Sequence, residues 1–185
     1  MLDVGRHPRI EILTYSEVAG LSGECGDFTV TINRKARYVK EALCTACGRC
    51  VEKCPGKASD EFELGLAQRK AIYLYFPQGI PAVYTIDPEV CIKFTKNRCG
   101  VCQKVCEQGA IDFEMQDEEV ELRVGAIIVA TGYDLIDEGR LKVYHPDNPN
   151  VMTALQMERL IENELTEGKV LKTDDGERVK SVAYI

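Results

Sequence analysis

The chain has 185 residues, of which 45% are hydrophobic and 29% charged. This length and composition fit one domain, or one domain with a small insert, and they exclude wholesale disorder and a collagen-like fibre. The net charge of −7 argues against nucleic-acid binding, which usually needs a basic face. No apolar run approaches the ~18 residues of a membrane-spanning helix. The longest such runs are Ala71–Phe76 and Ala126–Ala130.

Two strands are predicted near the N-terminus, over Ile10–Thr14 and Phe28–Asn33. In the second, apolar and polar residues alternate, which is typical of a half-buried strand. Three glycines, Gly20, Gly23 and Gly26, indicate an irregular connection between the two strands.

The middle of the chain predicts less regular structure. Asp60–Lys70 is polar and weakly helical, and the prolines and aromatic residues of Ala71–Pro81 favour an extended connector. Further on, two strands are predicted over Ala110–Met115 and Val120–Val124, separated by the acidic turn Asp117–Glu119.

The C-terminal third contains a continuous apolar run, Gly125–Ala130, which predicts a strand buried on both faces. A helix is predicted over Thr153–Leu165, with Gln156 completing a capping box at its start. Asp175-Gly176 suits a hairpin turn, and Val179–Ile185 is predicted as a last strand. Because the chain ends inside that strand, we expect it to be a fragment or a split subunit.

Cysteine is the outlier of the composition, with nine residues in a chain that has no tryptophan. An odd number excludes a fully paired set of disulfides within one chain. Eight of the nine lie in two tight groups, and thiols crowded in this way indicate a metal site. The start of the sequence shows no basic-then-apolar leader, so we expect a reducing, cytoplasmic setting.

The two groups form an internal repeat. The first is Cys44-x2-Cys47-x2-Cys50-x3-Cys54 and the second is Cys91-x7-Cys99-x2-Cys102-x3-Cys106, followed by Gly56-Lys57-Ala58 and Gly109-Ala110-Ile111 respectively. The first matches the bacterial ferredoxin pattern, in which the fourth cysteine binds the other cluster. The sequence therefore predicts two [4Fe–4S] clusters, one held by Cys44, Cys47, Cys50 and Cys106 and the other by Cys91, Cys99, Cys102 and Cys54. The long gap after Cys91 contains Lys93, Lys96 and Arg98, which predict a basic rim that raises the potential of that cluster.

Two Cys₄ zinc sites that only staple an interaction module are the main alternative. Zinc ribbons usually pair cysteines in separated Cys-x2-Cys knuckles, so the spacing favours iron–sulfur clusters. The ninth cysteine, Cys25, is predicted to be a buried or idle thiol.

A flavin motif is also suggested after the second cysteine group. The run that ends in Thr131-Gly132, followed by Asp134, resembles the second dinucleotide-domain signature of flavin disulfide reductases, and the resemblance implies that Thr131 and Gly132 lie beside FAD. A complete small flavoprotein reductase is a third alternative. The Gly-x-Gly-x-x-Gly turn that holds the pyrophosphate at a helix N-terminus is missing, which counts against it.

Over nearly its full length the chain resembles the A subunit of heterodisulfide reductase, the flavin and iron–sulfur subunit found in methanogens and related bacterial complexes. The resemblance is carried by Asp3–Pro8, Leu13–Val18, Lys35–Val39, Cys44–Pro55, Arg69–Tyr73, Phe76–Gln78, Tyr84–Asp87 and Ala130–Asp134. It implies an α+β fold in which a bacterial-type 2[4Fe–4S] ferredoxin module is inserted into part of a thioredoxin-reductase-like FAD/NAD-binding domain. The implied domains are part of a β-meander at 1–35, the ferredoxin module at 36–115 and the return segment at 116–185. Glu107 departs from the pattern, because ferredoxins often have proline after the fourth cysteine.

The resemblance also implies a function. The chain would relay single electrons between a flavin and redox partners in an electron-bifurcating oxidoreductase, without making or breaking substrate bonds itself. The implied partners are other subunits of the complex, a hydrogenase or formate dehydrogenase module, and ferredoxin. FAD is expected in the full-length subunit and not in this chain alone, because the phosphate-binding turn is absent.

Overall fold

The computed structural model describes residues 2–135, 140, 142–167 and 175–184. The chain divides into two compact units, one of residues 1–62 and 68–129 and the other of residues 63–67 and 130–185. In the described part of the chain, no helix combines the length and the apolar character needed to cross a membrane.

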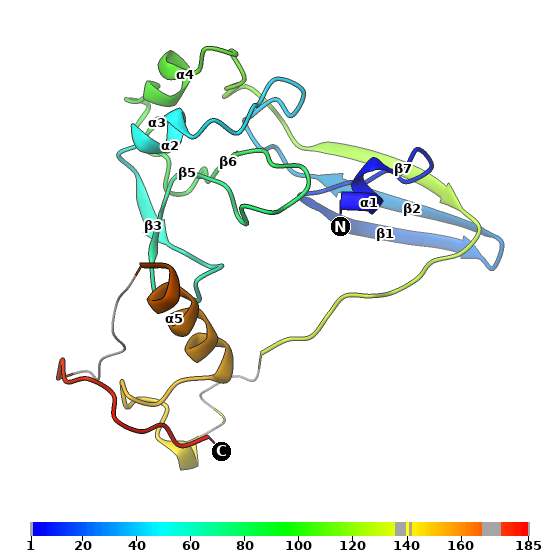
Figure 1. Cartoon of the computed structure of the whole chain (residues 1–185). Coiled ribbons are helices and arrows are strands. Elements are labelled where there is room, and N and C mark those ends of the chain that lie inside the picture. The colour runs from blue at the N-terminus through cyan, green and yellow to red at the C-terminus, as the bar shows by residue number, and fades with distance from the viewer. Residues whose placement is uncertain (1, 136–139, 141, 168–174, 185) are drawn as a thin grey trace. The chain divides into compact units, whose positions relative to one another are not determined.

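A three-stranded antiparallel sheet lies in the first unit (Figure 1). It consists of β1 (Ser16–Glu24), β2 (Asp27–Arg34) and β7 (Glu118–Val124), with β2 in the middle. The predicted strands Phe28–Asn33 and Val120–Val124 are thereby confirmed. Their alternating apolar residues share one face, since Val30 pairs with Leu122 on β7 and with Leu21 on β1.

The pairing of β2 with β7 determines where the cysteine groups lie relative to the sheet. Arg34, at the end of β2, pairs with Glu118, at the start of β7. Residues 35–117 therefore leave the sheet at one point and return to it beside that point.

The predicted strand at Ile10–Thr14 is wrong, because those residues have no regular structure. The strand is β1, which runs through Gly20 and Gly23 and turns directly into β2 at Cys25 and Gly26. A strand needs a partner for its backbone hydrogen bonds, and the tight β1–β2 turn supplies one. A register shift lies between Val18 and Gly20, and Gly23 has a positive φ of 94°.

Short elements make up the region that carries the cysteine groups. They are α2 (Arg49–Glu52), β3 (Lys57–Ser59), β4 (Gln68–Lys70), β5 (Ile72–Tyr73), β6 (Thr85–Ile86), α3 (Ile92–Lys96) and α4 (Val101–Val105). The side chains of Val39, Ile72 and Ile86 are each only 1% exposed and form the centre of its core, together with the buried cysteines.

The backbone repeats the same arrangement around both cysteine groups. A β-bridge joins Val39 to Ile111, and Lys40 N–H donates to the carbonyl of Ala110. Likewise β5 pairs with β6 through Ile72 and Ile86, and Asp87 N–H donates to the carbonyl of Ala71. Ala71 and Ile72 are therefore the counterparts of Ala110 and Ile111.

This correspondence overturns two sequence predictions. Ala58 is not the counterpart of Ala110 or Ile111, because a hairpin of β3 and β4 is inserted after Gly56. The predicted weak helix over Asp60–Lys70 is wrong for the same reason, since β4 pairs with β3 there. The predicted strand Ala110–Met115 is reduced to the single bridge at Ile111. The connector Ala71–Pro81 is confirmed apart from the two-residue β5.

The apolar run Gly125–Ala130 is not a buried strand. Its side chains at Ile128 and Val129 are 92% and 77% exposed, and no strand in the described part of the chain pairs with it. The sheet pairing ends at Gly125, whose carbonyl accepts from Gly26 N–H. Hydrophobicity alone predicted the strand, but a strand also needs a neighbouring backbone.

The second unit contains α5 (Ala154–Glu167), which confirms the predicted helix and its cap. Thr153 N–H donates to Gln156 Oε1 at 2.7 Å, and Gln156 N–H donates to Thr153 Oγ1 at 3.2 Å. The short 3₁₀ helix η2 (Lys142–Tyr144) precedes it, and α1 (Leu2–Arg6) opens the first unit. A turn occurs at Asp175-Gly176, but residues 179–184 are not a strand, and residue 185 lies outside the described residues.

Candidate metal centres

The first cysteine group is a loop that tightens into a helix. Gly48 has the left-handed backbone conformation (φ 84°) and starts α2, which carries the buried Cys50. Cys54 follows the helix, and its N–H donates to the carbonyl of Val51 at 3.1 Å.

The second group has an additional helix. Cys91 directly precedes α3, which ends at Asn97 in the left-handed conformation (φ 49°). The chain then reaches Cys99, and α4 carries the buried Cys102, with Cys106 following it. Helices α2 and α4 contact each other, so the two groups lie together.

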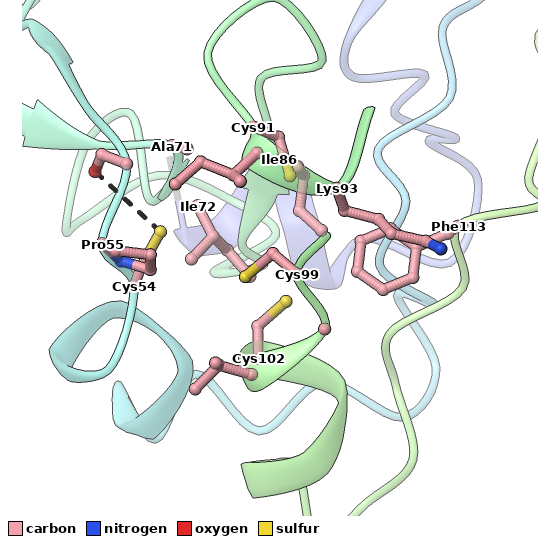
Figure 2. A pocket seen from close by; sticks show the side chains of 14 residues that line it. Cys54, Pro55, Ala71, Ile72, Ile86, Cys91, Lys93, Cys99, Cys102 and Phe113 are labelled. Atoms are coloured by element: carbon pink, nitrogen blue, oxygen red, sulfur yellow. Dashed lines mark hydrogen bonds between the residues drawn. The ribbon is translucent and has the colours of Figure 1, made fainter. Parts of the chain in front are cut away.

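One cavity, which we call the Cys91 cavity, is lined by Cys54, Cys91, Cys99 and Cys102 (Figure 2). The rest of its wall is mainly apolar and comprises Pro55, Gly56, Ala71, Ile72, Ile86, Ile92, Gly100, Val101 and Phe113. Lys93 is the one charged residue among the described residues that line it. Lys96 and Arg98 are exposed and do not line it, so the predicted basic rim is reduced to Lys93.

A second cavity, the Cys44 cavity, is lined by Cys44, Cys47, Cys50 and Cys106. Its wall is more polar and includes Thr45, Arg49, Tyr84, Glu107 and Gln108. Cys47 is exposed, whereas no cysteine of the Cys91 cavity is. Arg49 forms an exposed ion pair with Glu107, and the hydrogen bond to Glu107 raises the pKa of the guanidinium. Glu107, unusual in sequence, thus links the two cysteine groups.

Each cavity takes three cysteines from one group and the last cysteine from the other. The structure therefore brings together the two sets of four that the sequence pattern predicts as ligands, although ligation itself stays a prediction. Cys25 lies outside both cavities and is exposed at the β1–β2 turn, so of the predicted buried or idle thiol the buried alternative is wrong, and the idle one stays a prediction.

The electrostatics of the buried thiols fit a cationic occupant. Burial, together with the smaller effect of the neighbouring cysteines, raises the pKa of the Cys50 thiol to about 11 and that of the Cys102 thiol to about 12. Thiolates are the metal-binding form of cysteine. A positively charged metal centre would offset the cost of gathering four of them here, and soft thiolates select iron–sulfur clusters, zinc or Cu(I).

In the described part of the chain, no group of three or more His, Cys, Asp or Glu side chains is arranged to hold a single metal ion. A four-iron cluster makes no such demand, because each thiolate binds a different iron atom. One backbone group already points at a sulfur, since Ala110 N–H donates to Cys106 Sγ at 3.4 Å. Hydrogen bonds of this kind tune cluster potentials.

Sequence reasoning missed the residues that hold the start of each group. The N–H of Cys44 donates to the carbonyl of Lys40 at 3.1 Å, and the N–H of Cys91 donates to the carbonyl of Asp87 at 2.9 Å. A usable signal was present, because Lys40 and Asp87 each lie four residues before the first cysteine of their group. The flavin candidates Thr131 and Gly132 are exposed in an irregular stretch of the second unit, with Gly132 at φ 78°.

Comparison with known proteins supports an iron–sulfur region in this chain. A family model described as a 4Fe-4S binding domain matches residues 37–59, which contain all four cysteines of the first group. The full chain is 46% identical to the A subunit of the H(2):CoB-CoM heterodisulfide,ferredoxin reductase of Methanothermobacter marburgensis. It is also 47% identical over its full length to an iron-sulfur A subunit of the CoB--CoM heterodisulfide reductase of Methanopyrus kandleri.

This chain is a homologue of part of the A subunit of heterodisulfide reductase. Over 95% of its length it is also 44% identical to a protein of Archaeoglobus profundus that is itself described as like the heterodisulfide reductase A subunit. The chain spans only 28% of the length of each of these three relatives. The relationship confirms the resemblance seen in the sequence and supports a ferredoxin-type iron–sulfur region in a mixed α/β chain.

Proposed function

We propose that the chain holds two [4Fe–4S] clusters and serves as an electron-transfer module of a heterodisulfide-reductase-type oxidoreductase. The supporting observation is the exchange of the last cysteine between the two cavities: Cys54 lies with Cys91, Cys99 and Cys102, and Cys106 lies with Cys44, Cys47 and Cys50. This exchange is typical of two-cluster ferredoxins.

Each cluster, when bound, would accept and release one electron at a time. The protein's contribution is to fix the thiolates and keep water away from them. Ile72 and Ile86, each 1% exposed, line the Cys91 cavity, and Val39 does the same for the Cys44 cavity. Because α2 carries Cys50 and α4 carries Cys102, and the two helices contact each other, electrons would pass between the two sites over a short distance.

Two pairs of cysteine variants test the exchange. Cys54→Ser should remove the same cluster as Cys99→Ser, although Cys54 belongs to the first group in sequence. Cys106→Ser should likewise match Cys47→Ser. Anaerobically purified protein should contain about eight iron and eight sulfide per chain, and each variant about four. Cys54→Ser that instead matches Cys47→Ser in its electron paramagnetic resonance spectrum would contradict the exchange.

The same measurement separates this function from the zinc alternative. Two structural zinc sites would give colourless protein with about two zinc per chain and no labile sulfide.

We further infer that residues 36–115 form a ferredoxin module inserted into a flavin domain, to which residues 1–35 and 116–185 belong. The β2–β7 pairing supports this, because the module leaves and re-enters one sheet at paired residues, Arg34 and Glu118. Thr131 and Gly132 would contact FAD only in the longer protein. Stoichiometric FAD in the full-length protein, and none in this chain alone, is the expected result; FAD bound by this chain would contradict it.

In this role the module would exchange electrons with a flavin of the longer protein and with partner proteins. These partners would include ferredoxin, which the names of two relatives mention. The family resemblance further implies the other subunits of a bifurcating complex, with a hydrogenase or formate dehydrogenase module. Co-purification of the tagged full-length protein from its source, followed by mass spectrometry, would identify them.

A further inference from the structure

The inserted β3–β4 hairpin contains a buried cation. The side chain of Arg69, on β4, is only 7% exposed. A charge buried to this extent is costly unless it is paired and hydrogen-bonded. The contacts of the Arg69 side chain therefore indicate which part of the structure the hairpin stabilises.

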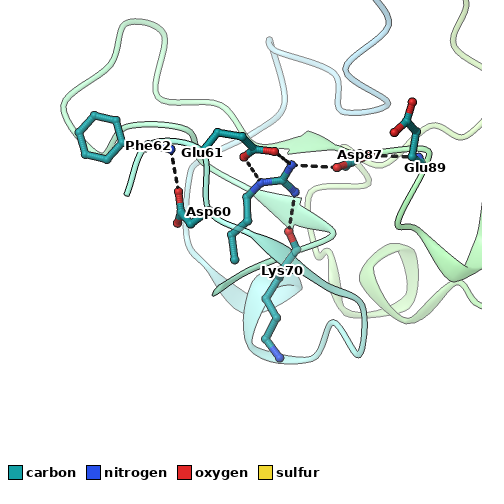
Figure 3. Close-up of polar contacts among 7 residues, drawn as sticks. Asp60, Glu61, Phe62, Lys70, Asp87 and Glu89 are labelled. Atoms are coloured by element: carbon teal, nitrogen blue, oxygen red, sulfur yellow. Dashed lines mark hydrogen bonds and ion pairs between the residues drawn. The ribbon is translucent and has the colours of Figure 1, made fainter. Parts of the chain in front are cut away.

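Arg69 is paired on every side, and Figure 3 shows the carboxylates of Glu61 and Asp87 with which it pairs. Its Nη2 donates to Asp87 Oδ2 at 2.8 Å, and Nε and Nη2 both donate to the carboxylate of Glu61. Nη1 donates to the carbonyl of Lys70 at 3.4 Å, and the guanidinium lies 3.9 Å from the ring centroid of Tyr73. Arg69 therefore connects the inserted hairpin to Asp87.

Asp87 connects Arg69 to Cys91, which is a predicted cluster ligand. Its second carboxylate oxygen accepts from Glu89 N–H at 3.0 Å, and its own N–H donates to the carbonyl of Ala71 at 2.8 Å. Its carbonyl then accepts from Cys91 N–H at 2.9 Å. Every polar group of Asp87 is thus in use, and Cys91 is attached to it directly.

Cys91 needs such an anchor more than its counterpart does. Two residues separate Cys44 from Cys47, so the local backbone holds them together, but seven residues separate Cys91 from Cys99. In the other half of the repeat, Lys40 occupies the position of Asp87 and pairs with Asp112 at 3.1 Å. The side chains of that pair are 49% and 30% exposed, so its contribution is weakened by solvent.

We propose that Arg69, acting through Asp87, is the positioning residue that holds Cys91 at the Cys91 cavity, and that the cluster of this cavity, but not the other, depends on it. This inference rests on the proposed function. The hairpin is thereby assigned a role: it places a buried cation on Asp87, whose carbonyl accepts from the N–H of Cys91, the cysteine farthest in sequence from the rest of its group.

The test compares Arg69→Met with the matched variant Lys40→Met in anaerobically purified protein. Iron and sulfide are determined per chain, and the reduced proteins are examined by electron paramagnetic resonance. Spectra of Cys99→Ser and Cys47→Ser identify the signal of each cluster. We expect Arg69→Met to fall from about eight iron to about four and to resemble Cys99→Ser, whereas Lys40→Met keeps about eight. Arg69→Lys, which retains the charge, should recover part of the lost iron.

Asp87→Asn serves as a second variant, because it keeps an oxygen for Glu89 N–H but removes the ion pair. If circular dichroism shows that Arg69→Met does not fold, Asp87→Asn decides, with the same selective loss expected. Unchanged iron and spectra in these variants, equal loss of both clusters, or an equal loss in Lys40→Met would overturn the inference. Unsubstituted protein without iron would overturn the proposed function first, and the inference with it.

Discussion

The two cysteine cavities share one backbone plan but differ in their surroundings. The Cys91 cavity is lined almost entirely by apolar residues and has no exposed cysteine, whereas the Cys44 cavity has a polar wall and an exposed Cys47. The anchors differ in the same sense, because the Arg69–Asp87 pair is buried and the Lys40–Asp112 pair is not.

This difference shows how one motif can produce two unequal sites. Burial disfavours the more negative, reduced form of a thiolate-bound cluster, so we expect the cluster of the Cys91 cavity to have the lower potential. Lys93 opposes this effect, since it lines that cavity. Polar groups such as Tyr84 and Arg49 act around the Cys44 cavity instead.

The largest loss of stability should follow from a substitution at Gly56, where the backbone packs closely beside the Cys91 cavity. A Cβ on Gly56 would lie 2.7 Å from the Cβ of Ala71, and neither atom can move without the backbone. Gly56→Ala should therefore cost about 1–3 kcal/mol of unfolding free energy, as overpacked cores do. Anaerobic urea unfolding followed by circular dichroism measures it. Gly100→Ala is the control, because nothing lies within 4 Å of its added Cβ.

A smaller loss of stability is expected from glycine substitutions at the start of α2 and α4, the helices that carry Cys50 and Cys102. Gly48 before α2 has φ 84°, whereas its counterpart Gly100 before α4 has φ 165°, which other residues also adopt. Gly48→Ala should cost about 1–2 kcal/mol, because a left-handed conformation is unfavourable for alanine. Gly100→Ala should change the urea midpoint little. An equal loss of stability in Gly48→Ala and Gly100→Ala would contradict the role assigned to the left-handed conformation of Gly48.

The charge beside the Cys91 cavity should have a modest electrochemical effect. Lys93→Met is expected to lower the potential of that cluster by about 10–40 mV. This range corresponds to an interaction of about 0.2–0.9 kcal/mol for a one-electron couple. Protein-film voltammetry measures the shift. Lys96→Met, which removes an exposed charge that does not line the cavity, should leave the potential unchanged; an equal shift would indicate a general charge effect.

The smallest effect concerns pH. Hydrogen bonds from Arg69 lower the pKa of Glu61, so its pairing stabilises the fold above the ordinary carboxylate pKa of about 4.3 and is lost as pH falls through the lowered value. Glu61→Gln should therefore have a lower urea midpoint than the unsubstituted protein near pH 7. The two midpoints should converge in acid. A difference that persists at the lowest pH would mean that the ion pair is not its source.

The sequence by itself determined the features that depend on local spacing. The Cys-x2-Cys-x3-Cys endings indicated the two sets of cysteines, period-two alternation predicted β2, and the pair Thr153 and Gln156 predicted the start of α5. Each of these features depends on residues a few positions apart, so the spacing that is visible in the sequence also determines the local structure.

Only the tertiary structure decided which segments become neighbours. The apolar run Gly125–Ala130 looked like a strand but has no pairing partner in the described part of the chain, while the glycine-containing β1 is a strand because β2 lies beside it. The inserted β3–β4 hairpin moved Ala71 into the place expected for Ala58 and brought Arg69 to Asp87. Such contacts join residues far apart in sequence, and no local pattern encodes them because backbone pairing and burial are satisfied only when the chain has folded.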